Sequence, residues 1–159
     1  MAQTEARDAD LGWALGTLLR GYLRRSAEAL GDLPGGPRGY QVLSTVSAGS
    51  CGSQAAIAES TGLDRTVLTY LLDDLETAGL VVRSPDPNDR RARRITLTDA
   101  GTSRLIELSS RMRQVEDQLL GGLPLTEADT LRVALAHAAH SLDEQPQEVC
   151  DTVDEAARG

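Results

Sequence analysis

The clearest chemistry in this sequence lies in a cluster of arginines near its middle. Between Arg83 and Arg94, five arginines stand against two aspartates, a local charge of +3 in twelve residues. All sixteen cations of the chain are arginine and none is lysine. The planar guanidinium donates paired hydrogen bonds to phosphates and to guanine. The cluster therefore indicates a surface for nucleic acid, although arginine-only usage is also typical of proteins from GC-rich genomes.

The charge of the whole chain points the other way. Its 159 residues contain 24 acidic and 16 basic side chains, which give a net charge of −8 and a pI near 4.7. A phosphate backbone repels a net anion. The surplus is concentrated in residues 105–159, where eleven acids face four arginines. The chain is long enough for one compact domain, or for one unit that completes its core by pairing with a copy of itself.

Other groups that could do chemistry are few. Cys51 and Cys150 are far apart and predict no disulfide framework. His137 and His140 could share a helix face as metal ligands, but we expect ordinary surface or dimer-face histidines. The sequence contains no phosphate-binding glycine loop, nucleophile elbow or His-Glu metal motif. We therefore expect no enzyme activity, no cofactor and no metal. The polar N-terminus and the absence of a long apolar run predict a cytoplasmic protein without a membrane segment.

Four helices are expected in the first half of the chain, at about 10–30, 38–48, 54–60 and 65–78. In the first, apolar side chains recur at intervals of three and four, the period of one helix face, until the breaker from Pro34 to Pro37. Ser53 and Asp64 stand where the third and fourth helices begin, and both are good N-caps. The tight turn between these helices contains Gly62.

A β-hairpin and two further helices are expected in the second half. Gly79 stands where a helix C-cap belongs, and short strands follow at about 80–82 and 94–98, joined by turn residues that include 85–88. After a corner at 99–101, apolar residues spaced 3, 4, 3, 4 form a coiled-coil-like seam that needs a facing surface: Leu105, Leu108, Met112, Val115 and Leu119. Pro124 ends that helix and Thr126 is the expected cap of the last one, before a polar, acidic tail from about 145.

Two short helices across a glycine turn predict a helix-turn-helix, and the basic hairpin after it makes the unit winged. Residues 53–101 resemble the MarR family of bacterial transcriptional regulators. The wing signature of that family is an Asp-x-Arg step, an apolar residue and Leu-Thr before a glycine corner. Here it is formed by Asp89, Arg91, Ile95, Leu97, Thr98 and Gly101. This ordered match is far more specific than a helix-turn-helix pattern alone.

The resemblance implies a mainly α fold with a small β-hairpin wing (α+β) and a homodimer. Residues 1–36 and 102–159 would form a helical dimerisation region, and residues 37–101 the winged DNA-binding unit. Such a dimer reads a pseudo-palindrome in double-stranded DNA whose half-sites lie about one helical turn apart. The expected function is a sequence-specific transcriptional regulator, a repressor modulated by a small molecule.

The expected DNA-binding residues lie on three elements. On the helix 65–78 and the start of the preceding helix they are Ser53, Gln54, Arg65, Thr66, Thr69 and Tyr70, and on the wing Arg90, Arg91, Arg93 and Arg94. The resemblance assigns Arg91 to the minor groove, with Asp89 as its brace through an ion pair, whereas Asp89 alone could simply be a turn residue. Tyr70 and Asp74 depart from the family, which often has a basic residue at each position. A solvated helix face remains the alternative for this surface.

The family also implies a small aromatic or phenolic anion as effector, bound between the dimerisation helices and the winged unit. Trp13, Arg20, Tyr22 and Tyr40 could line such a cleft, or could be ordinary packing residues. Two other functions stay open. One is a winged-helix module that binds protein instead of DNA, and the other is a thiol-based redox sensor that uses Cys51. No adjacent cation lowers the pKa of that thiol, which favours an inert cysteine.

Overall fold

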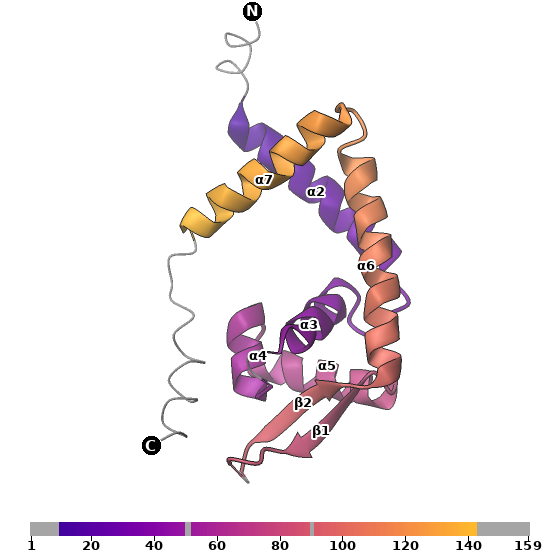
Figure 1. Ribbon diagram of the computed structural model, residues 1–159, viewed down its shortest axis with the longest axis vertical. Coiled ribbons are helices and arrows are strands. Elements are labelled where there is room, and N and C mark those ends of the chain that lie inside the picture. Colours follow the sequence, from indigo (N-terminus) through magenta and orange to yellow (C-terminus); the bar gives the residue numbers. More distant parts are fainter. Residues whose placement is uncertain (1–9, 50–51, 90, 143–159) are drawn as a thin grey trace, which may run out of the picture.

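The computed structural model describes residues 10–49, 52–89 and 91–142 as six helices and one two-stranded antiparallel sheet (Figure 1). The helices are α2 Leu11–Ala29, α3 Pro37–Ala48, α4 Gln54–Thr61, α5 Arg65–Thr77, α6 Asp99–Leu119 and α7 Leu125–Leu142. The strands are β1 Val81–Pro85 and β2 Arg93–Leu97. This mainly helical fold with one hairpin confirms the expected α+β class.

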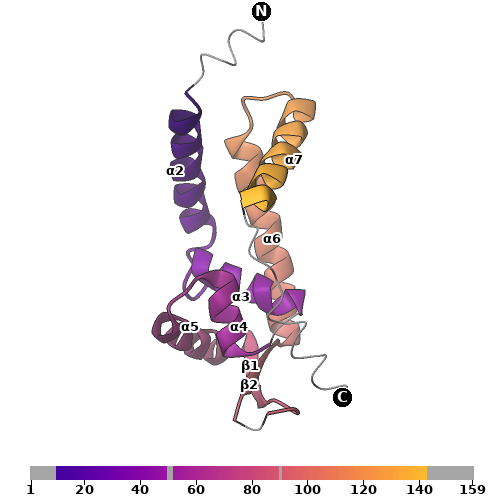
Figure 2. The same ribbon diagram turned by 90° about the vertical axis from the view of Figure 1, so that its left-hand side faces the viewer.

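The winged unit and the outer helices lie at opposite ends of the molecule. Figure 1 shows α3, α4, α5 and the hairpin at one end, α2 and α7 at the other, and α6 running between them. Helix α2 packs against the side of α6. In Figure 2, α2 and α7 stand apart, and α7 turns back from the far end of α6 toward the winged unit. This arrangement places the hairpin tip and α5 together at the end farthest from α2 and α7.

Side-chain caps explain where the two helices of the helix-turn-helix begin. The Ser53 hydroxyl accepts a hydrogen bond from the Ala56 amide (3.2 Å). The Asp64 carboxylate accepts one from the Thr66 amide (2.8 Å). These bonds satisfy amides that have no partner inside the first turn of a helix. Both predicted N-caps are confirmed.

Two predicted boundaries are wrong. Helix α7 begins at Leu125, one residue before the expected cap Thr126. The reason is that the Pro124 carbonyl already accepts hydrogen bonds from the amides of Glu127 and Ala128. In the hairpin, Pro85 belongs to β1 and pairs with Arg93 instead of opening the loop. Proline is tolerated there because the pair lies at the end of the ladder, where an amide donor is dispensable.

A glycine contact fixes how α6 leaves the hairpin. Gly101 lies in the first turn of α6, against the Leu80 residue that precedes β1. A Cβ atom at Gly101 would collide with the carbonyl oxygen of Leu80, so only glycine permits this approach. The Thr98 hydroxyl also donates to the carbonyl of Gly79 (2.6 Å). The glycine corner of the wing signature therefore has a packing reason.

The apolar seam of α6 is covered by the protomer itself. Leu108, Met112 and Val115 are at most 5% exposed and lie in one core cluster with side chains of α3 and α5. The facing surface that this seam needs is therefore supplied within one protomer. Helical spacing shows that a face is buried, but it does not show which helices bury it.

An ion-pair cluster fastens the loop after α2 to α6. Asp32 lies 2.6 Å from the guanidinium of Arg104 and 2.9 Å from that of Arg111, and Glu107 bridges the same two arginines. Hydrogen bonds from Arg104 and Arg111 hold the pKa of Asp32 below its ordinary value. Arg111 also donates to the carbonyl of Ala29 (3.2 Å). The cluster joins the end of α2 to the middle of the molecule.

Candidate nucleic-acid interface

The outward face of α5 is built by the burial of its other face. Leu68, Leu72 and Leu75 are completely buried, which fixes the rotation of the helix about its axis. The side chains that this rotation leaves exposed are Arg65, Thr66, Thr69 and Tyr70, with Tyr70 68% exposed. These are the four residues of α5 that were predicted to face DNA. The structure brings them together on one accessible surface.

Hydrogen bonds hold Thr69 between the two helices. The Gln54 side-chain amide donates to the Thr69 hydroxyl (2.6 Å), and that hydroxyl donates to the carbonyl of Arg65 one turn earlier (2.8 Å). One donor of the Gln54 amide is therefore already used and is not available to a phosphate. It ties the start of α4 to the outward face of α5.

The wing places three arginines beside this helix. Arg91, Arg93 and Arg94 are exposed, and none of them forms an ion pair within the part of the chain that the structure describes. Arg90 lies outside the described residues, as does Cys51. The hairpin therefore presents uncompensated positive charge next to α5.

Asp89 acts on the backbone of the wing and not on a guanidinium. Its carboxylate accepts a hydrogen bond from the amide of Arg91 (2.9 Å), and its carbonyl accepts one from Ala92 (3.0 Å). The predicted ion pair with Arg91 is not formed. A turn of this kind is a common use of aspartate, whose short side chain reaches the amide two residues on. Asp89 thus shapes the tip and leaves the Arg91 side chain free.

The start of α4 joins the hairpin as a third backbone segment. Ser53 forms an antiparallel bridge with Arg94, and the amide of Ile95 donates to the carbonyl of Gly52 (2.7 Å). The side chain of Arg94 covers Gly52 so closely that a Cβ atom there would come within 2.8 Å of it. These contacts hold the predicted phosphate ligands Ser53 and Arg94 next to each other.

Arg83 is an important residue of this surface that sequence reasoning missed. Its guanidinium lies 2.7 Å from both Asp73 and Glu76 on α5, and it donates to the carbonyl of Thr69 (3.4 Å). Burial opposes the guanidinium charge, but the hydrogen bonds with Asp73 and Glu76 raise the pKa of Arg83. Arg83 therefore locks the recognition helix to β1 instead of adding to the free charge of the wing. The signal that could have indicated this ion pairing is the presence of two acids, Asp73 and Glu76, three residues apart on α5.

The four expected effector residues do not share one cleft. Arg20 lines a recess of about 470 Å³ on α2, and Tyr22 lines a second, of about 300 Å³, between α2, α6 and α7. Tyr40 lies elsewhere, with its hydroxyl 3.3 Å from that of Ser109, and Trp13 is 69% exposed. Residues two positions apart on a helix point in nearly opposite directions, which separates Arg20 from Tyr22.

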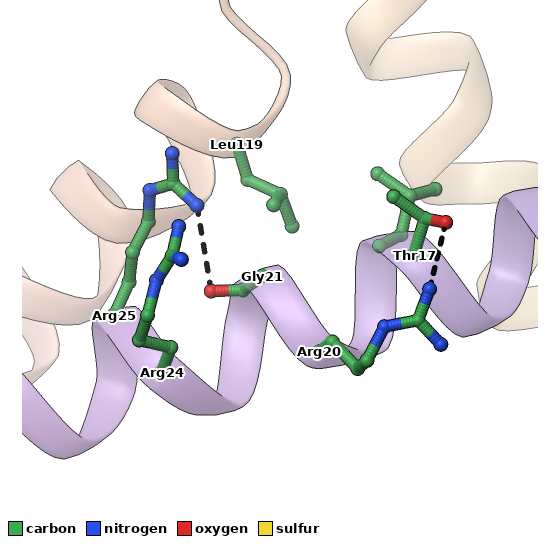
Figure 3. A pocket seen from close by; sticks show the side chains of 7 residues that line it. Thr17, Arg20, Gly21, Arg24, Arg25 and Leu119 are labelled. Carbon is green, nitrogen blue, oxygen red and sulfur yellow. Dashed lines mark hydrogen bonds between the residues drawn. The ribbon is translucent and has the colours of Figure 1, made fainter.

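The first recess is lined by cations. Figure 3 shows Arg20, Arg24 and Arg25 around it, with Leu119 of α6 above the helix. Arg20 donates to the hydroxyl of Thr17 (3.1 Å), and Arg25 donates to a backbone carbonyl of its own helix (3.5 Å). No acidic side chain is among the residues that line this recess. Burial raises the pKa of the Tyr22 phenol in the neighbouring recess, and the Glu116 carboxylate adds to this effect.

The histidines show no shared metal geometry. The ring of His140 lies 2.6 Å from the carbonyl of Ala136, one turn earlier on α7. Within residues 10–49, 52–89 and 91–142, no three His, Cys, Asp or Glu side chains are grouped to hold a metal ion. In the same ranges, no helix is both long and apolar enough to cross a bilayer.

The fold and this surface define a winged helix-turn-helix protein. Residues 40–92 match the sequence profile of the MarR family. A MarR-family transcriptional regulator from Rhodococcus sp. RHA1 is 30% identical, with a TM-score of 0.69 over 82% of this chain and 92% of that chain. The transcriptional repressor CouR bound to a 23-mer DNA duplex matches with the same values. A cysteine mutant of MarR from E. coli is 25% identical, with a TM-score of 0.73 over 82% and 97% of the two chains.

The chain belongs to the MarR family of DNA-binding transcriptional regulators. This membership confirms the resemblance drawn from the wing signature. The regulators of this family are DNA-binding proteins and not enzymes.

Proposed function

We propose that this protein is a homodimeric cytoplasmic repressor that binds a pseudo-palindromic site in double-stranded DNA and responds to a small organic anion. In this proposal α5 enters the major groove, where Arg65, Thr66, Thr69 and Tyr70 meet base edges and phosphates. The wing follows the backbone and places Arg91 in the adjacent minor groove. Narrow minor grooves concentrate negative potential, which suits a guanidinium on a hairpin tip.

The position of the uncompensated arginines carries this proposal. Four described arginines are held in ion pairs with carboxylates: Arg83, Arg104, Arg111 and Arg132. The described arginines of the α5 and wing surface are exposed and have no such partner: Arg65, Arg91, Arg93 and Arg94. Free cations on the same end of the molecule as the recognition helix are what a phosphate backbone requires. CouR, a 30% identical relative, was solved bound to a 23-mer DNA duplex, which supports double-stranded DNA as the partner of this chain.

Exposed apolar side chains on α2 and α7 support the homodimer. Only Ala128 is buried on α7, while Leu125, Val133 and Leu142 are 85%, 57% and 88% exposed. On α2, Leu11, Trp13, Leu19 and Leu23 are more than half exposed. Two helices at one end of the molecule with this much apolar surface need a cover. A second copy of the chain supplies an equally apolar cover, because a two-fold axis packs the same face of both protomers together.

The arginine-lined recess on α2 is the proposed effector site. Its guanidinium groups suit a carboxylate or phenolate, and Leu18 and Leu119 offer apolar contact to a ring. The recess lies on the helix that we assign to the dimer face. An anion bound there can change the spacing of the two recognition helices only if it binds one arrangement of the dimer more tightly than the other.

Selection from a random duplex pool tests the function. The full chain should enrich a two-fold symmetric site, and fluorescence anisotropy should then measure affinity over a range of salt. Arg91→Ala should weaken binding to all duplexes, with a loss of about one unit of salt slope per lost phosphate contact. Arg113→Ala is the matched control, because Arg113 is also exposed and without an ion pair but lies on α6.

Two results would contradict the proposal. One is a folded dimer that binds no duplex even at low salt, which would favour the protein-interaction module. The other is an Arg91→Ala variant whose affinity and salt slope equal those of the wild type. Equal losses in the Arg91 and Arg113 variants would show only that total charge matters.

A further inference from the structure

Thr69 is held more firmly than any other exposed side chain of the recognition helix. Its hydroxyl bonds Gln54 and the carbonyl of Arg65, and its own carbonyl accepts a hydrogen bond from Arg83. These partners come from α4, from the preceding turn of α5 and from β1. The side chain is nevertheless exposed on the face assigned to DNA. The structure thus fixes the orientation of a side chain that is exposed to solvent.

The hydroxyl of Thr69 has no proton left to donate to a base, and one of its two acceptor positions is also occupied. A hydroxyl has one proton to donate, and here the carbonyl of Arg65 takes it at 2.8 Å. The Gln54 amide occupies an acceptor position at 2.6 Å. To donate to an acceptor of guanine, adenine or thymine, Thr69 would have to break its bond to Arg65, so the exchange gains no hydrogen bond. The group of this side chain without a polar partner is its methyl.

We propose that Thr69 reads the C5-methyl group of a thymine in the major groove, and that Gln54 is the positioning residue that makes it do so. The C5-methyl is the apolar group that thymine presents in the major groove, and a threonine methyl can make van der Waals contact with it. Gln54 contributes by keeping the hydroxyl turned to the protein. This inference rests on the proposed function, since it names the base chemistry that the same α5 surface selects.

Uracil substitution isolates the methyl group. In the duplex enriched by the wild-type chain, each thymine is replaced in turn by uracil, and affinity is measured for the symmetric pair of positions. At one position, uracil should weaken wild-type binding about fourfold per half-site, the effect of one buried methyl group, or roughly fifteenfold when both half-sites are changed. At the same position, 5-methylcytosine should bind more tightly than cytosine by a similar factor.

Three variants separate this role from a general loss of affinity, because the measured quantity is the thymine-to-uracil ratio. Thr69→Ser keeps the hydroxyl and its two bonds but removes the methyl, so the ratio should fall to about one. Gln54→Leu removes one of the two hydrogen bonds that orient the hydroxyl, so the ratio should fall although the methyl remains. Thr102→Ser is the matched control, because Thr102 is also exposed and its hydroxyl also donates to the carbonyl four residues earlier (3.1 Å), but it lies on α6; this variant should keep the wild-type ratio. Circular dichroism confirms that each variant is folded.

The outcomes distinguish this inference from the function beneath it. A chain that enriches no duplex overturns the proposed function and this inference with it. A chain that binds its duplex but shows a ratio of one at every thymine overturns only the methyl contact. A Thr69→Ser variant that retains the wild-type ratio has the same effect, since another side chain would then hold the methyl.

Discussion

Replacement of Arg83 by leucine should weaken both the fold and DNA binding, for two different reasons. The side chain of Arg83 is 19% exposed, and it lies 2.7 Å from carboxylates that are 54% and 39% exposed at Asp73 and Glu76. Ion pairs this open to solvent contribute about 0.3–1 kcal/mol each. Their joint loss should lower the free energy of unfolding by about 0.6–2 kcal/mol, or the melting temperature by roughly 1–8 °C for a domain of this size.

The effect on DNA binding comes from the two carboxylates that remain. Without Arg83, Asp73 and Glu76 leave uncompensated negative charge on the recognition helix. A carboxylate about 10 Å from a phosphate is repelled by about 0.4 kcal/mol in water before screening by salt. Two carboxylates in each of two protomers sum to about 1.6 kcal/mol, or about a fifteenfold loss of affinity before screening. Screening at about 0.01 M salt reduces this to about fivefold to tenfold, and the loss shrinks further as salt is added.

Anisotropy titrations at two salt concentrations and thermal denaturation measure these effects. Asp73→Asn and Glu76→Gln, introduced together with Arg83→Leu, should restore DNA affinity because they remove the repulsion. Arg113→Leu is the control for loss of an arginine without partners. Arg83→Leu with unchanged melting and unchanged affinity would refute the reasoning. A loss of affinity that persists in the triple variant would mean that Arg83 contacts DNA directly.

Two further predictions concern the dimer and its effector. Leu23→Glu should raise the dimer dissociation constant at least about thirtyfold, since burial of a leucine contributes about 1–2 kcal/mol in each copy, whereas Val82→Glu on the wing should not; sedimentation that shows equal dimers for both would contradict the assigned face. Arg24→Ala should abolish the rise in melting temperature given by whichever member of a panel of aromatic carboxylates stabilises the wild type. Arg38→Ala should keep that rise, and an Arg24 variant that also keeps it would exclude the recess.

Local patterns were sufficient to predict the elements of this fold. Ser53 and Asp64 predict two helix starts, because a capping side chain bonds an amide only two or three residues further along the chain. The glycine corner at Gly101 was predicted from the wing signature, whereas its packing reason, the close approach to Leu80, is a contact between residues distant in the sequence. The sequence could not tell which surface covers the α6 seam, because Leu108 and Met112 show only that one helix face is apolar. The answer depends on how α2 and α3 pack against α6, which is a property of the whole protomer.

The candidate site was predicted in its exposed residues and not in its connections. Thr66, Thr69 and Tyr70 follow from the buried face of one helix, so spacing alone places them outward. Arg83 was instead grouped with the arginines of the wing, because counting charge along the chain ignores what the fold brings beside it. Strand β1 returns along α5 after Gly79, and this return places Arg83 against α5 acids at positions seven and ten residues earlier.

The opposition between an acidic chain and a DNA-binding fold is resolved by position. Residues 10–142 contain sixteen acids against fourteen arginines, so most of the net charge of −8 belongs to residues 1–9 and 143–159. Within the described residues, ion pairs remove four arginines from the available charge, and the arginines without such partners include those beside α5 and those around the α2 recess. The first group faces the proposed DNA surface and the second the proposed effector site. In the proposed function, arginine therefore binds a polyanion at one end of the protomer and a small anion at the other, and α6 runs between these two ends.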